Sequence, residues 1–448
     1  MSSTSPVKSE QFELAIWRLK AGLEKKFSKG HPWVFSSDLD QSPKGVAPGA
    51  FVELRSSTDQ FLAFGYGNPT TLIAFRTLAR IPVGRDARQL IGFLSGVLEQ
   101  AARLRHSVGI DRLSHRLIFG EADGLPGLVI DRYIGKSPDG TRGQVFVVQS
   151  STAGADQLLP FLLSSLLGFA SGDLAFSGEG RALPTAIVVT QDSSARGIEG
   201  IKKEPRRVVQ SWPGFEPSSF QIEVQSVAGV APYWVNFVDG QKTGFFLDQR
   251  LNVRLAWPLF ERAIALAVNQ GRRLKMLDLF CYVGQWSVQA SLAAKVQNGA
   301  IDVDLADASA AALALASRNV EEVGGTAVAR KMDVVQDIGK LPVGQYDIVI
   351  CDPPAFAKKK KDLPTGLAAY QKLNREAIRR VRPGGVFVTC SCSGLVTDDD
   401  FESMIAHAVR ASGRDVRWIV RGGHGEDHPS ISEFPQGRYL KGWIGVVQ

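Results

Sequence analysis

The sequence predicts an α/β protein whose C-terminal half forms a doubly wound parallel sheet, preceded by a small β-rich domain and an α+β middle domain. Three observations support this fold class. The chain has 448 residues, more than the roughly 100–200 of one ordinary domain. Short strand-like runs separated by turn residues occupy its beginning. From Lys275 onward, strands alternate with helices.

The N-terminal domain is expected at residues 13–82. Its strand-like runs, separated by Gly, Pro and Asn, are 51–54, 61–65 and 72–75. Before them, residues 25–35 form an expected loop that mixes lysines with aromatic residues, which can grip phosphates and stack on bases. The same composition suits a solvated loop around a buried Trp33, so the sequence leaves both interpretations open.

The middle domain is expected at residues 83–215. Apolar residues at helical spacing over 90–104 predict a helix, and three apolar runs predict strands at 128–130, 145–148 and 186–189. Residues 171–180 are interpreted as a loop or lid. The charged stretch 202–207 is interpreted as a polar boundary before the last domain.

The last domain is expected at residues 216–448. Its predicted strands are 276–280, 301–306, 348–351 and 386–390, and its predicted helices are 288–296, 310–320 and 370–381. Such a sheet binds ligands at the carboxyl ends of its strands. Most of the acidic and thiol residues discussed below lie there.

Composition excludes several classes of protein. With 44% hydrophobic and 22% charged residues the chain is typical of a soluble globular protein. Its apolar runs are shorter than the roughly 20 residues of a membrane helix, and Met1–Pro6 lacks the layout of a secretory signal, so no membrane and a cytoplasmic location are expected. The net charge of +7 suits a polyanionic partner.

The four cysteines are expected to be reduced thiols, because all lie in the last two-fifths of the chain rather than in a disulfide framework. Cys390 and Cys392 form a C-x-C without a second ligand pair, so no metal site is predicted.

The run Leu277–Ser287 passes from a strand through a loop into a helix and contains one glycine. A dinucleotide-binding loop needs three glycines to approach a pyrophosphate, so S-adenosylmethionine fits better than NAD. Asp278 would meet the donor's ammonium group or order the loop; capping the next turn is the alternative. Asp307 is the candidate for the ribose hydroxyls or an N-cap. Asp333 is the candidate for the adenine amino group, or a turn residue.

Asp352-Pro353-Pro354-Ala355-Phe356 ends an apolar strand, and its two prolines stiffen the loop that presents the carboxylate. Asp352 could bind the edge of a base while Phe356 stacks or packs beside it; a simple turn acid is the alternative. The Lys358–Lys361 run is an accessory phosphate contact or a solvated surface.

Thr389–Leu395 should leave the sheet at the same edge, with the side chains of Cys390 and Cys392 on one side and Cys392 farther out. A thiolate could add to carbon 6 of a pyrimidine and so activate carbon 5 for methylation. Buried structural cysteines are the alternative.

At these residues the sequence resembles the RlmI-like family of bacterial 23S rRNA cytosine-5 methyltransferases, over nearly the whole chain. The family's motifs are carried by Gly120–Gly127, Asp131–Tyr133, Gly240–Arg250 and Tyr439–Gly442. The resemblance implies an N-terminal PUA domain that binds RNA, a middle domain beside the substrate cleft and a Rossmann-like class I methyltransferase domain. It also implies 23S rRNA as the partner rather than DNA, and leaves a homodimer open.

By the match of Ser391–Leu395 to the family's motif, the resemblance assigns the nucleophile to Cys392. Asp352, at the end of its strand, is the second expected catalytic residue. The expected cofactor-binding residues are Asp278, Phe280, Tyr282, Gly284, Asp307, Ala308, Asp333 and Val334. The expected active-site wall comprises Lys242, Phe246, Asp248, Arg250, Pro353 and Phe356.

The chain departs from related enzymes in three places. RNA cytosine-5 methyltransferases outside this family carry a second cysteine after the Asp-Pro pair, where this chain has Pro354 and Ala355, so product release needs another helper, such as a water held by Asp352. Gln285-Trp286 and Ile301–Asp307 differ from the family pattern. The Asp-Pro-Pro-aromatic string also resembles exocyclic-amine methyltransferases, and a non-catalytic RNA-binding assembly factor is the third possibility.

Overall fold

The computed structural model describes residues 11–172, 183–357 and 359–448. Its chain divides into two compact units. The first contains Met1–Pro217 with the short segments Gln241–Thr243 and Pro429–Gly437, and the second contains Ser218–Gly240, Gly244–His428 and Arg438–Gln448. Three predicted features fall outside the described residues: Met1–Pro6, residues 173–180 of the expected loop at 171–180, and Lys358 of the lysine run.

The first unit begins with a five-stranded sheet in the order β1-β3-β4-β5-β2. Its elements are β1 (Ala15–Arg18), α1 (Glu24–Phe27), β2 (Trp33–Phe35), β3 (Phe51–Arg55), β4 (Phe61–Gly67) and β5 (Ile73–Ala79). Trp17, Leu54 and Phe75 are among the residues that fill its core. The expected loop at 25–35 is therefore wrong in part, because α1 and β2 occupy its two ends and Val34 joins the core.

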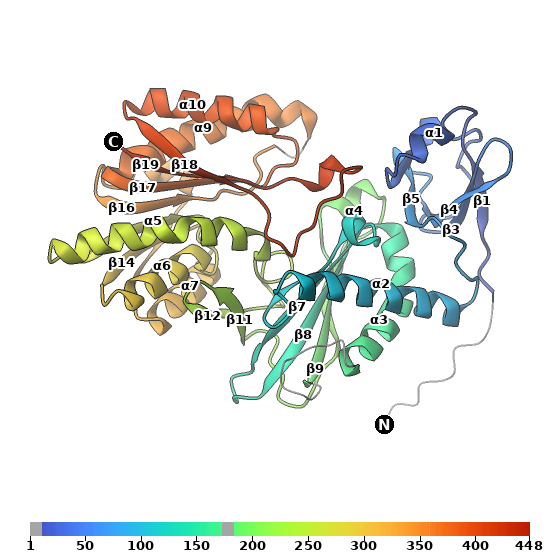
Figure 1. The fold of residues 1–448 in the computed structure, drawn as a ribbon, viewed down its shortest axis with the longest axis horizontal. Helices are drawn as coiled ribbons and strands as arrows, with labels where there is room; N and C mark the ends of the chain where they lie inside the picture. The colour runs from blue at the N-terminus through green and yellow to red at the C-terminus, as the bar shows by residue number, and fades with distance from the viewer. Residues whose placement is uncertain (1–10, 173–182, 358) are drawn as a thin grey trace. The chain divides into compact units, whose positions relative to one another are not determined.

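The rest of the first unit packs two helices on a second sheet (Figure 1). Its elements are α2 (Ala87–Ser107), β6 (His115–Phe119), β7 (Leu128–Lys136), β8 (Arg142–Ser150), α3 (Ala153–Ser171), β9 (Thr185–Gln191), α4 (Ala195–Ile198) and β10 (Glu204–Gln210). Strands β10-β9-β8-β7 are neighbours in that order and β6 pairs with β7. Residues 204–207 of the expected polar boundary at 202–207 lie in edge strand β10, whose exposed charges suit a sheet edge.

Helix α3 is the one described helix long and apolar enough to cross a membrane. Of its apolar window, 56% is buried, and Leu158, Leu162 and Leu166 belong to the core under the sheet. A core helix of a globular protein has these properties, so the composition of α3 is weak support for a membrane span.

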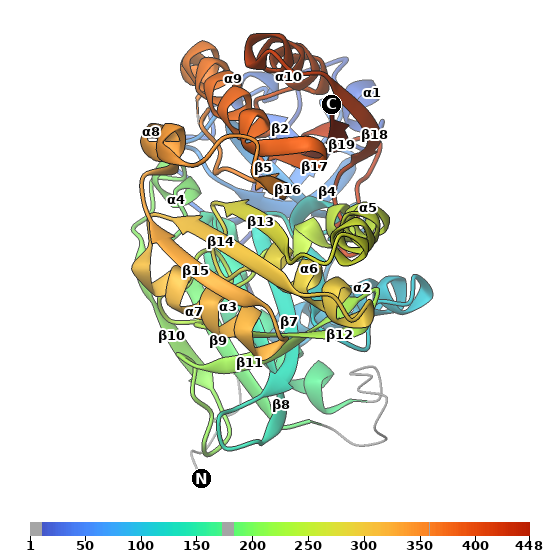
Figure 2. The ribbon, with the colours of Figure 1, turned by 90° about the vertical axis from the view of Figure 1, so that its left-hand side faces the viewer.

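The second unit begins with the hairpin β11 (Phe220–Ser226) and β12 (Gly229–Val235), followed by α5 (Arg250–Asn269). A seven-stranded sheet follows in the order β15-β14-β13-β16-β17-β19-β18, which Figure 2 shows. The strands are β13 (Leu274–Leu279), β14 (Ile301–Asp307), β15 (Thr326–Lys331), β16 (Tyr346–Cys351), β17 (Val381–Ser391), β18 (Val416–Gly422) and β19 (Lys441–Val447). Only β19 runs antiparallel to its neighbours, an exception to the predicted parallel sheet.

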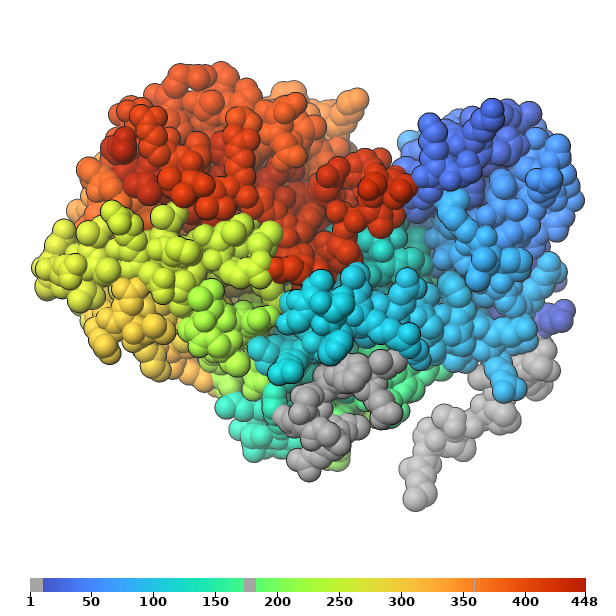
Figure 3. Space-filling model, in the orientation of Figure 1, coloured from blue at the N-terminus to red at the C-terminus, as the bar shows by residue number. Residues whose placement is uncertain are grey.

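Helices cover both faces of this sheet. They are α6 (Gln285–Val296), α7 (Ala310–Glu322), α8 (Val334–Asp337), α9 (Leu363–Arg380) and α10 (Asp398–Ser412). Helices α9 and α10 pack together on one side, whereas α5, α6 and α7 form the other layer. In the space-filling view α5 and the C-terminal segment form one continuous surface (Figure 3).

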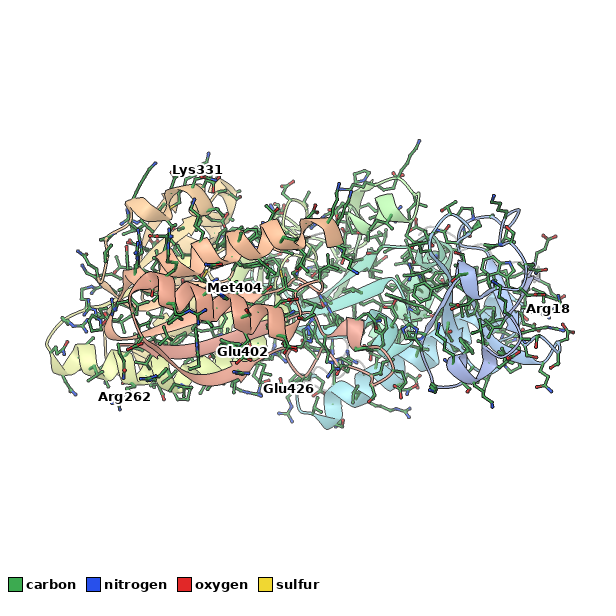
Figure 4. All side chains as sticks on the ribbon, turned by 90° about the horizontal axis from the view of Figure 1, so that it is seen from above. Arg18, Arg262, Lys331, Glu402, Met404 and Glu426 are labelled. Atoms are coloured by element: carbon green, nitrogen blue, oxygen red, sulfur yellow. The ribbon has the colours of Figure 1, made fainter. Side chains whose placement is uncertain are left out.

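Helix α10 shows how amphipathic spacing sets the layers. Figure 4 labels Glu402 and Met404 on it. Glu402 pairs with Arg421 of β18 at the surface, at 2.8 Å, while Met404 is buried in the core below. Strands β13 and β16 are neighbours, and the sheet continues to β14 on one side and to β17 on the other, so the strand order reverses between them. In this fold ligands bind in the crevice beyond the carboxyl ends of two such strands.

Candidate active site

The loop after β13 has an unusual backbone. Phe280 and Tyr282 have φ of 61° and 48°, and Gly284, the N-cap of α6, has φ of 81°. Left-handed conformations are uncommon for residues other than glycine and cluster where a site needs a fixed backbone. Glycine suits position 284 for a second reason, since an added Cβ would lie 3.3 Å from the Cα atom of Ala316 in α7.

Asp307 holds this loop against the end of β14. Its Oδ2 accepts a hydrogen bond from the Tyr282 N–H at 3.1 Å, and its Oδ1 accepts one from the Ser309 N–H at 2.9 Å. The helix cap is Ser309, whose hydroxyl accepts from the Ala312 N–H at 3.2 Å, so the N-cap alternative for Asp307 is wrong. The half-buried Asp307 carboxylate is thus oriented at the strand end, as a ribose-binding acid would be.

Asp278 lies one residue before the end of β13 and is 1% exposed. Its Oδ2 accepts from the Ser287 hydroxyl at 2.5 Å, while its Oδ1 is buried without a partner among the described residues. Burial, together with the nearby charges of Asp352 and Asp307, raises the pKa of this carboxyl to about 7. A buried, incompletely satisfied carboxylate is expensive. The ammonium group of S-adenosylmethionine would satisfy it, so this residue fits that ligand.

Asp333 and its neighbours are less distinctive. Asp333 is exposed and caps α8 by accepting from the Gln336 N–H at 3.2 Å, which supports the local alternative. Val334 is buried in the core under the sheet, and Ala308 is exposed at the start of the turn before α7. A contact of these three residues with the adenosine remains a prediction.

Asp352 is held from two sides. Its Oδ2 accepts from Nε2 of Gln249 at 2.8 Å and from the Trp286 indole N–H at 3.3 Å. The Gln249 amide is itself oriented, because its Oε1 accepts from Nδ2 of Asn252 at 2.7 Å. Gln249 is 4% exposed and Asn252 is fully buried. Asp352 is therefore a fixed, half-buried carboxylate at the carboxyl end of β16.

Tyr370 of α9 holds the turn that follows Asp352. Its hydroxyl donates to the carbonyl oxygen of Pro354 at 3.3 Å and accepts from the Phe356 N–H at 3.4 Å. The rings of Phe356 and Tyr370 lie 4.6 Å apart. Phe356 thus packs on the protein with part of its ring still exposed, and Pro353 is buried.

The four cysteines are free thiols in very different surroundings. Cys281, Cys351 and Cys390 are buried, and burial raises the pKa of each. Cys390 lies within β17 with its Sγ 3.8 Å from Oε1 of Gln249. Cys392 follows the strand, is partly exposed, and has its Sγ 4.0 Å from the carbonyl oxygen of Pro353. The structure therefore brings Cys392 next to the Asp352 loop.

The predicted wall segment is divided. Phe246 packs edge-on against Tyr282 at 5.1 Å, and the Asp248 carboxylate accepts from the Tyr439 hydroxyl at 2.6 Å. Arg250 starts α5 and is buried. Lys242, in contrast, belongs with Gln241–Thr243 to the first unit, where its carbonyl oxygen accepts from Arg206 at 2.7 Å. Its assignment to the wall remains a prediction.

Sequence reasoning missed three residues of this region. Gln249 lies within the Gly240–Arg250 motif and has no predicted role, yet its side chain contacts both Asp352 and Cys390. Trp286 differs from the family pattern and has no predicted role, yet its indole N–H donates to Asp352. Tyr439 lies in the Tyr439–Gly442 motif, also without a predicted role, and its hydroxyl donates to Asp248. No cluster of three or more His, Cys, Asp or Glu suited to a metal ion occurs in the part of the chain that the structure describes.

Comparisons with known proteins agree with this architecture. Residues 18–80 match a PUA-like domain family, and residues 262–410 match the methyltransferase small domain family. A solved structure described as a methyltransferase complexed with SAH has a TM-score of 0.68 at 18% identity, covering 97% of this chain and 100% of that one. A protein described as a SAM-dependent methyltransferase from Streptococcus mutans gives a TM-score of 0.67 with the same coverage. These two likenesses establish the fold.

Full-length relatives establish the family. Ribosomal RNA large subunit methyltransferase I of Klebsiella pneumoniae subsp. pneumoniae is 31% identical over 435 residues, which is 95% of this chain and 96% of the relative. The protein of that name from Citrobacter koseri is 31% identical over 436 residues, 95% of this chain and 97% of the relative. These relatives match the chain at 31% identity over nearly the full length of both proteins, and the chain has the PUA-like domain and the methyltransferase domain described above. The chain therefore belongs to the ribosomal RNA large subunit methyltransferase I family.

Proposed function

We propose that this protein transfers a methyl group from S-adenosylmethionine to ribosomal RNA, at carbon 5 of a cytosine in 23S rRNA, through a covalent adduct with Cys392. One observation carries the proposal. Of the four cysteines, Cys392 is the partly exposed one, and its sulfur lies 4.0 Å from the loop that presents Asp352. A nucleophile and a base-binding carboxylate at one sheet edge are what this reaction needs.

S-adenosylmethionine supplies an electrophilic methyl group when bound. The chain's contribution there is the loop from Phe280 to Gly284, fixed by Asp307, and the buried carboxylate of Asp278. Asp278 binds the ammonium group, and Asp307 accepts from the ribose hydroxyls. Because neither task involves a phosphate, one glycine in the loop is enough.

Cys392 is favoured over Cys390 by its surroundings. Cys390 is fully buried, and its thiol donates weakly to Gln249, so a thiolate there would be desolvated and inaccessible to a base. Cys392 lies beyond the strand and can reach a ligand in the crevice. Asp352, oriented by Gln249 and Trp286, accepts a hydrogen bond from the exocyclic amino group of the cytosine.

The reaction then follows from these positions. The Cys392 thiolate adds to carbon 6, and the electron pair displaced to carbon 5 bonds to the methyl group as the methyl–sulfur bond of the donor breaks, which leaves S-adenosylhomocysteine. A base removes the carbon 5 proton, and breakage of the sulfur–carbon 6 bond restores the aromatic ring and the thiolate. A water held by Asp352 serves as the proton acceptor, since no second cysteine follows the Asp-Pro pair.

The substrate must offer an unstacked cytosine, because carbon 6 cannot be reached within a paired helix. The PUA-like domain and the net charge of +7 support binding of a polyanion. Ribosomal RNA before full assembly, in the cytoplasm, meets these requirements.

The test is methyl transfer from labelled S-adenosylmethionine to unmodified 23S rRNA, followed by digestion to nucleosides. We expect 5-methylcytosine with the intact protein and with Cys390→Ala, and none with Cys392→Ala. RNA containing 5-fluorocytosine should trap the adduct, because a base cannot remove fluorine from carbon 5 as a cation in the way that it removes a proton.

Other outcomes separate the alternatives. An N-methylated purine formed equally by Cys392→Ala would mean an exocyclic-amine methyltransferase that uses Asp352 without the thiol. RNA binding without any S-adenosylmethionine binding would mean an assembly factor.

A further inference from the structure

Lys441 is a buried lysine beside the proposed nucleophile. It is the first residue of β19, which pairs antiparallel with β17 so that Lys441 lies opposite Ser391, one residue before Cys392. Only 6% of it is exposed. Lysine is almost never buried to this degree unless its charge is compensated. The position of this ammonium group therefore needs an explanation.

The two hydrogen bonds of the Lys441 ammonium group do not provide that compensation. Its Nζ donates to the carbonyl oxygens of Ser393 and Tyr439, each at 3.0 Å. Both acceptors are neutral, and an ammonium group has three donors. Ser393 directly follows Cys392, so the first bond fixes the ammonium group at the turn that carries the thiol.

The charged groups around this turn come from four elements. Tyr370 of α9 and Lys441 of β19 both interact electrostatically with Cys392. Asp398 and Asp400 of α10 act on Lys441, and Asp352, after β16, acts on the neighbouring Cys390. Among these groups the three carboxylates oppose a thiolate, whereas Lys441 favours it. Burial lowers the pKa of Lys441, and the negative charges of Asp398, of a Cys392 thiolate and of Asp400 act in the opposite direction.

We propose that the buried ammonium group of Lys441 stabilises the Cys392 thiolate and orients the Ser391–Gly394 turn, which makes this cysteine reactive. Lys441 is thus a positioning residue rather than one that touches the substrate. The proposal rests on the proposed function for its purpose, since a reactive thiol at this place serves the covalent mechanism. Its test, however, needs no methyl transfer.

The experiment measures the rate of alkylation of Cys392 by iodoacetamide against pH in the full-length protein, with the Cys392 peptide quantified by mass spectrometry. We expect the midpoint for the intact protein to lie below about 8.5, the value of a free thiol. Lys441→Gln keeps a donor for the carbonyl oxygens but removes the charge, and should raise the midpoint by about one unit or more. Lys441→Arg keeps the charge and should restore most of the shift.

Lys295→Gln is the matched control. Lys295 is an exposed lysine in the last turn of α6, and helix α6 runs away from the carboxyl edge of β13, so its loss should leave the midpoint unchanged. A midpoint at or above 8.5 in the intact protein overturns the proposal, even if the Lys441 variants fail to fold. An unchanged midpoint in a folded Lys441→Gln protein overturns it as well.

These results separate the inference from the proposed function. If Cys392→Ala still forms 5-methylcytosine, the covalent mechanism fails while the effect of Lys441 on the thiol can stand. If the alkylation midpoint is the same in Lys441→Gln as in the intact protein but Cys392→Ala is inactive, only the role of Lys441 fails.

Discussion

At the scale of single residues, the candidate site is a set of oriented carboxylates. Asp278, Asp307 and Asp352 lie at or near the ends of neighbouring strands. Each is held by its own donors, which are Ser287 for Asp278, the Tyr282 and Ser309 N–H groups for Asp307, and Gln249 with Trp286 for Asp352. Three acids in one crevice repel one another, which favours a positively charged ligand there. S-adenosylmethionine carries positive charge on both its ammonium and its sulfonium groups.

Ligand binding should therefore depend on the ionisation of Asp278. Its pKa is raised to about 7, so the carboxyl is mostly neutral at pH 6 and ionised at pH 8. A cation binds the ionised form, so affinity should rise with pH and be about tenfold lower at pH 6 than on the plateau above pH 8. Calorimetric titration with S-adenosylhomocysteine checks this. Asp278→Asn should weaken binding and flatten the pH dependence; a steep dependence in that variant would assign the proton to another group.

Gln249 should matter for the chemical step more than for donor binding. Gln249→Ala removes a hydrogen bond to the Asp352 carboxylate, and such bonds are worth about 1.5–3 kcal/mol. We expect kcat for rRNA methylation to fall by at least about tenfold, with little change in affinity for S-adenosylhomocysteine. Gln270→Ala, at the exposed end of α5, is the control for loss of a glutamine side chain. An equal loss of donor affinity would instead indicate a general collapse of the site.

At the scale of secondary-structure elements, the reversed strand β19 decides what surrounds the thiol. It pairs with β17 from Lys441 to Val446 and places Gly442 opposite Cys390. The side chain of Asn252, from α5, packs on this glycine, because an added Cβ at Gly442 would lie 2.7 Å from its Cγ. The same Asn252 orients Gln249. Strand β19, helix α5 and Asp352 are thus linked through two buried amides.

Gly442→Ala tests this link. The added methyl group forces Asn252 to shift, and overpacking in a core costs about 1–3 kcal/mol. Chemical denaturation should show that loss of stability, and methyl transfer should fall because Gln249 loses its partner. Gly339→Ala is the comparison, since an added Cβ there meets no atom within 4 Å and the methyl group fits. Unchanged stability in Gly442→Ala would mean that Asn252 moves freely.

At the scale of the whole molecule, the first compact unit joins its two sheets through buried polar contacts. Arg76 of β5 pairs with Glu199 at 2.5 Å, and the side chains are 9% and 3% exposed. Glu199 also accepts from Nδ2 of Asn68 at 2.9 Å. The Trp33 indole donates to Glu121 at 2.8 Å. The boundary predicted after residue 82 thus lies within one compact unit, and the three-domain division stays a prediction.

Glu199→Ala should weaken RNA binding through this unit alone. Removing one partner of a buried ion pair leaves Arg76 uncompensated and costs about 3–5 kcal/mol. We expect a lower melting temperature for the first unit and lower affinity for rRNA, while S-adenosylhomocysteine binding, which uses residues of the second unit, is unchanged. Glu99→Ala, an exposed partner of Arg103 on α2, should have little effect on either. Loss of S-adenosylhomocysteine binding in Glu199→Ala would contradict this separation.

The features that could be predicted from the amino-acid sequence are those set by residues that are close together along the chain. Apolar periodicity located β13, β14, β16 and the later part of β17, and Asp307 and Asp352 could be placed at strand ends because each directly follows an apolar run. The motifs predicted the PUA-like and methyltransferase domains, which the comparisons confirm. These features need only neighbours in the sequence.

The partners and the burial of the site residues depend on residues that are distant along the chain, and these features became visible only in the folded structure. Gln249 and Asp352 are 103 positions apart, and Lys441 and Ser393 are 48 apart. Whether a cysteine is buried or exposed depends on the strands and helices that cover it, so Cys390 and Cys392 could not be distinguished by spacing alone. The physical reason is that a local pattern fixes the direction of a side chain, whereas its partners and its burial are fixed by packing.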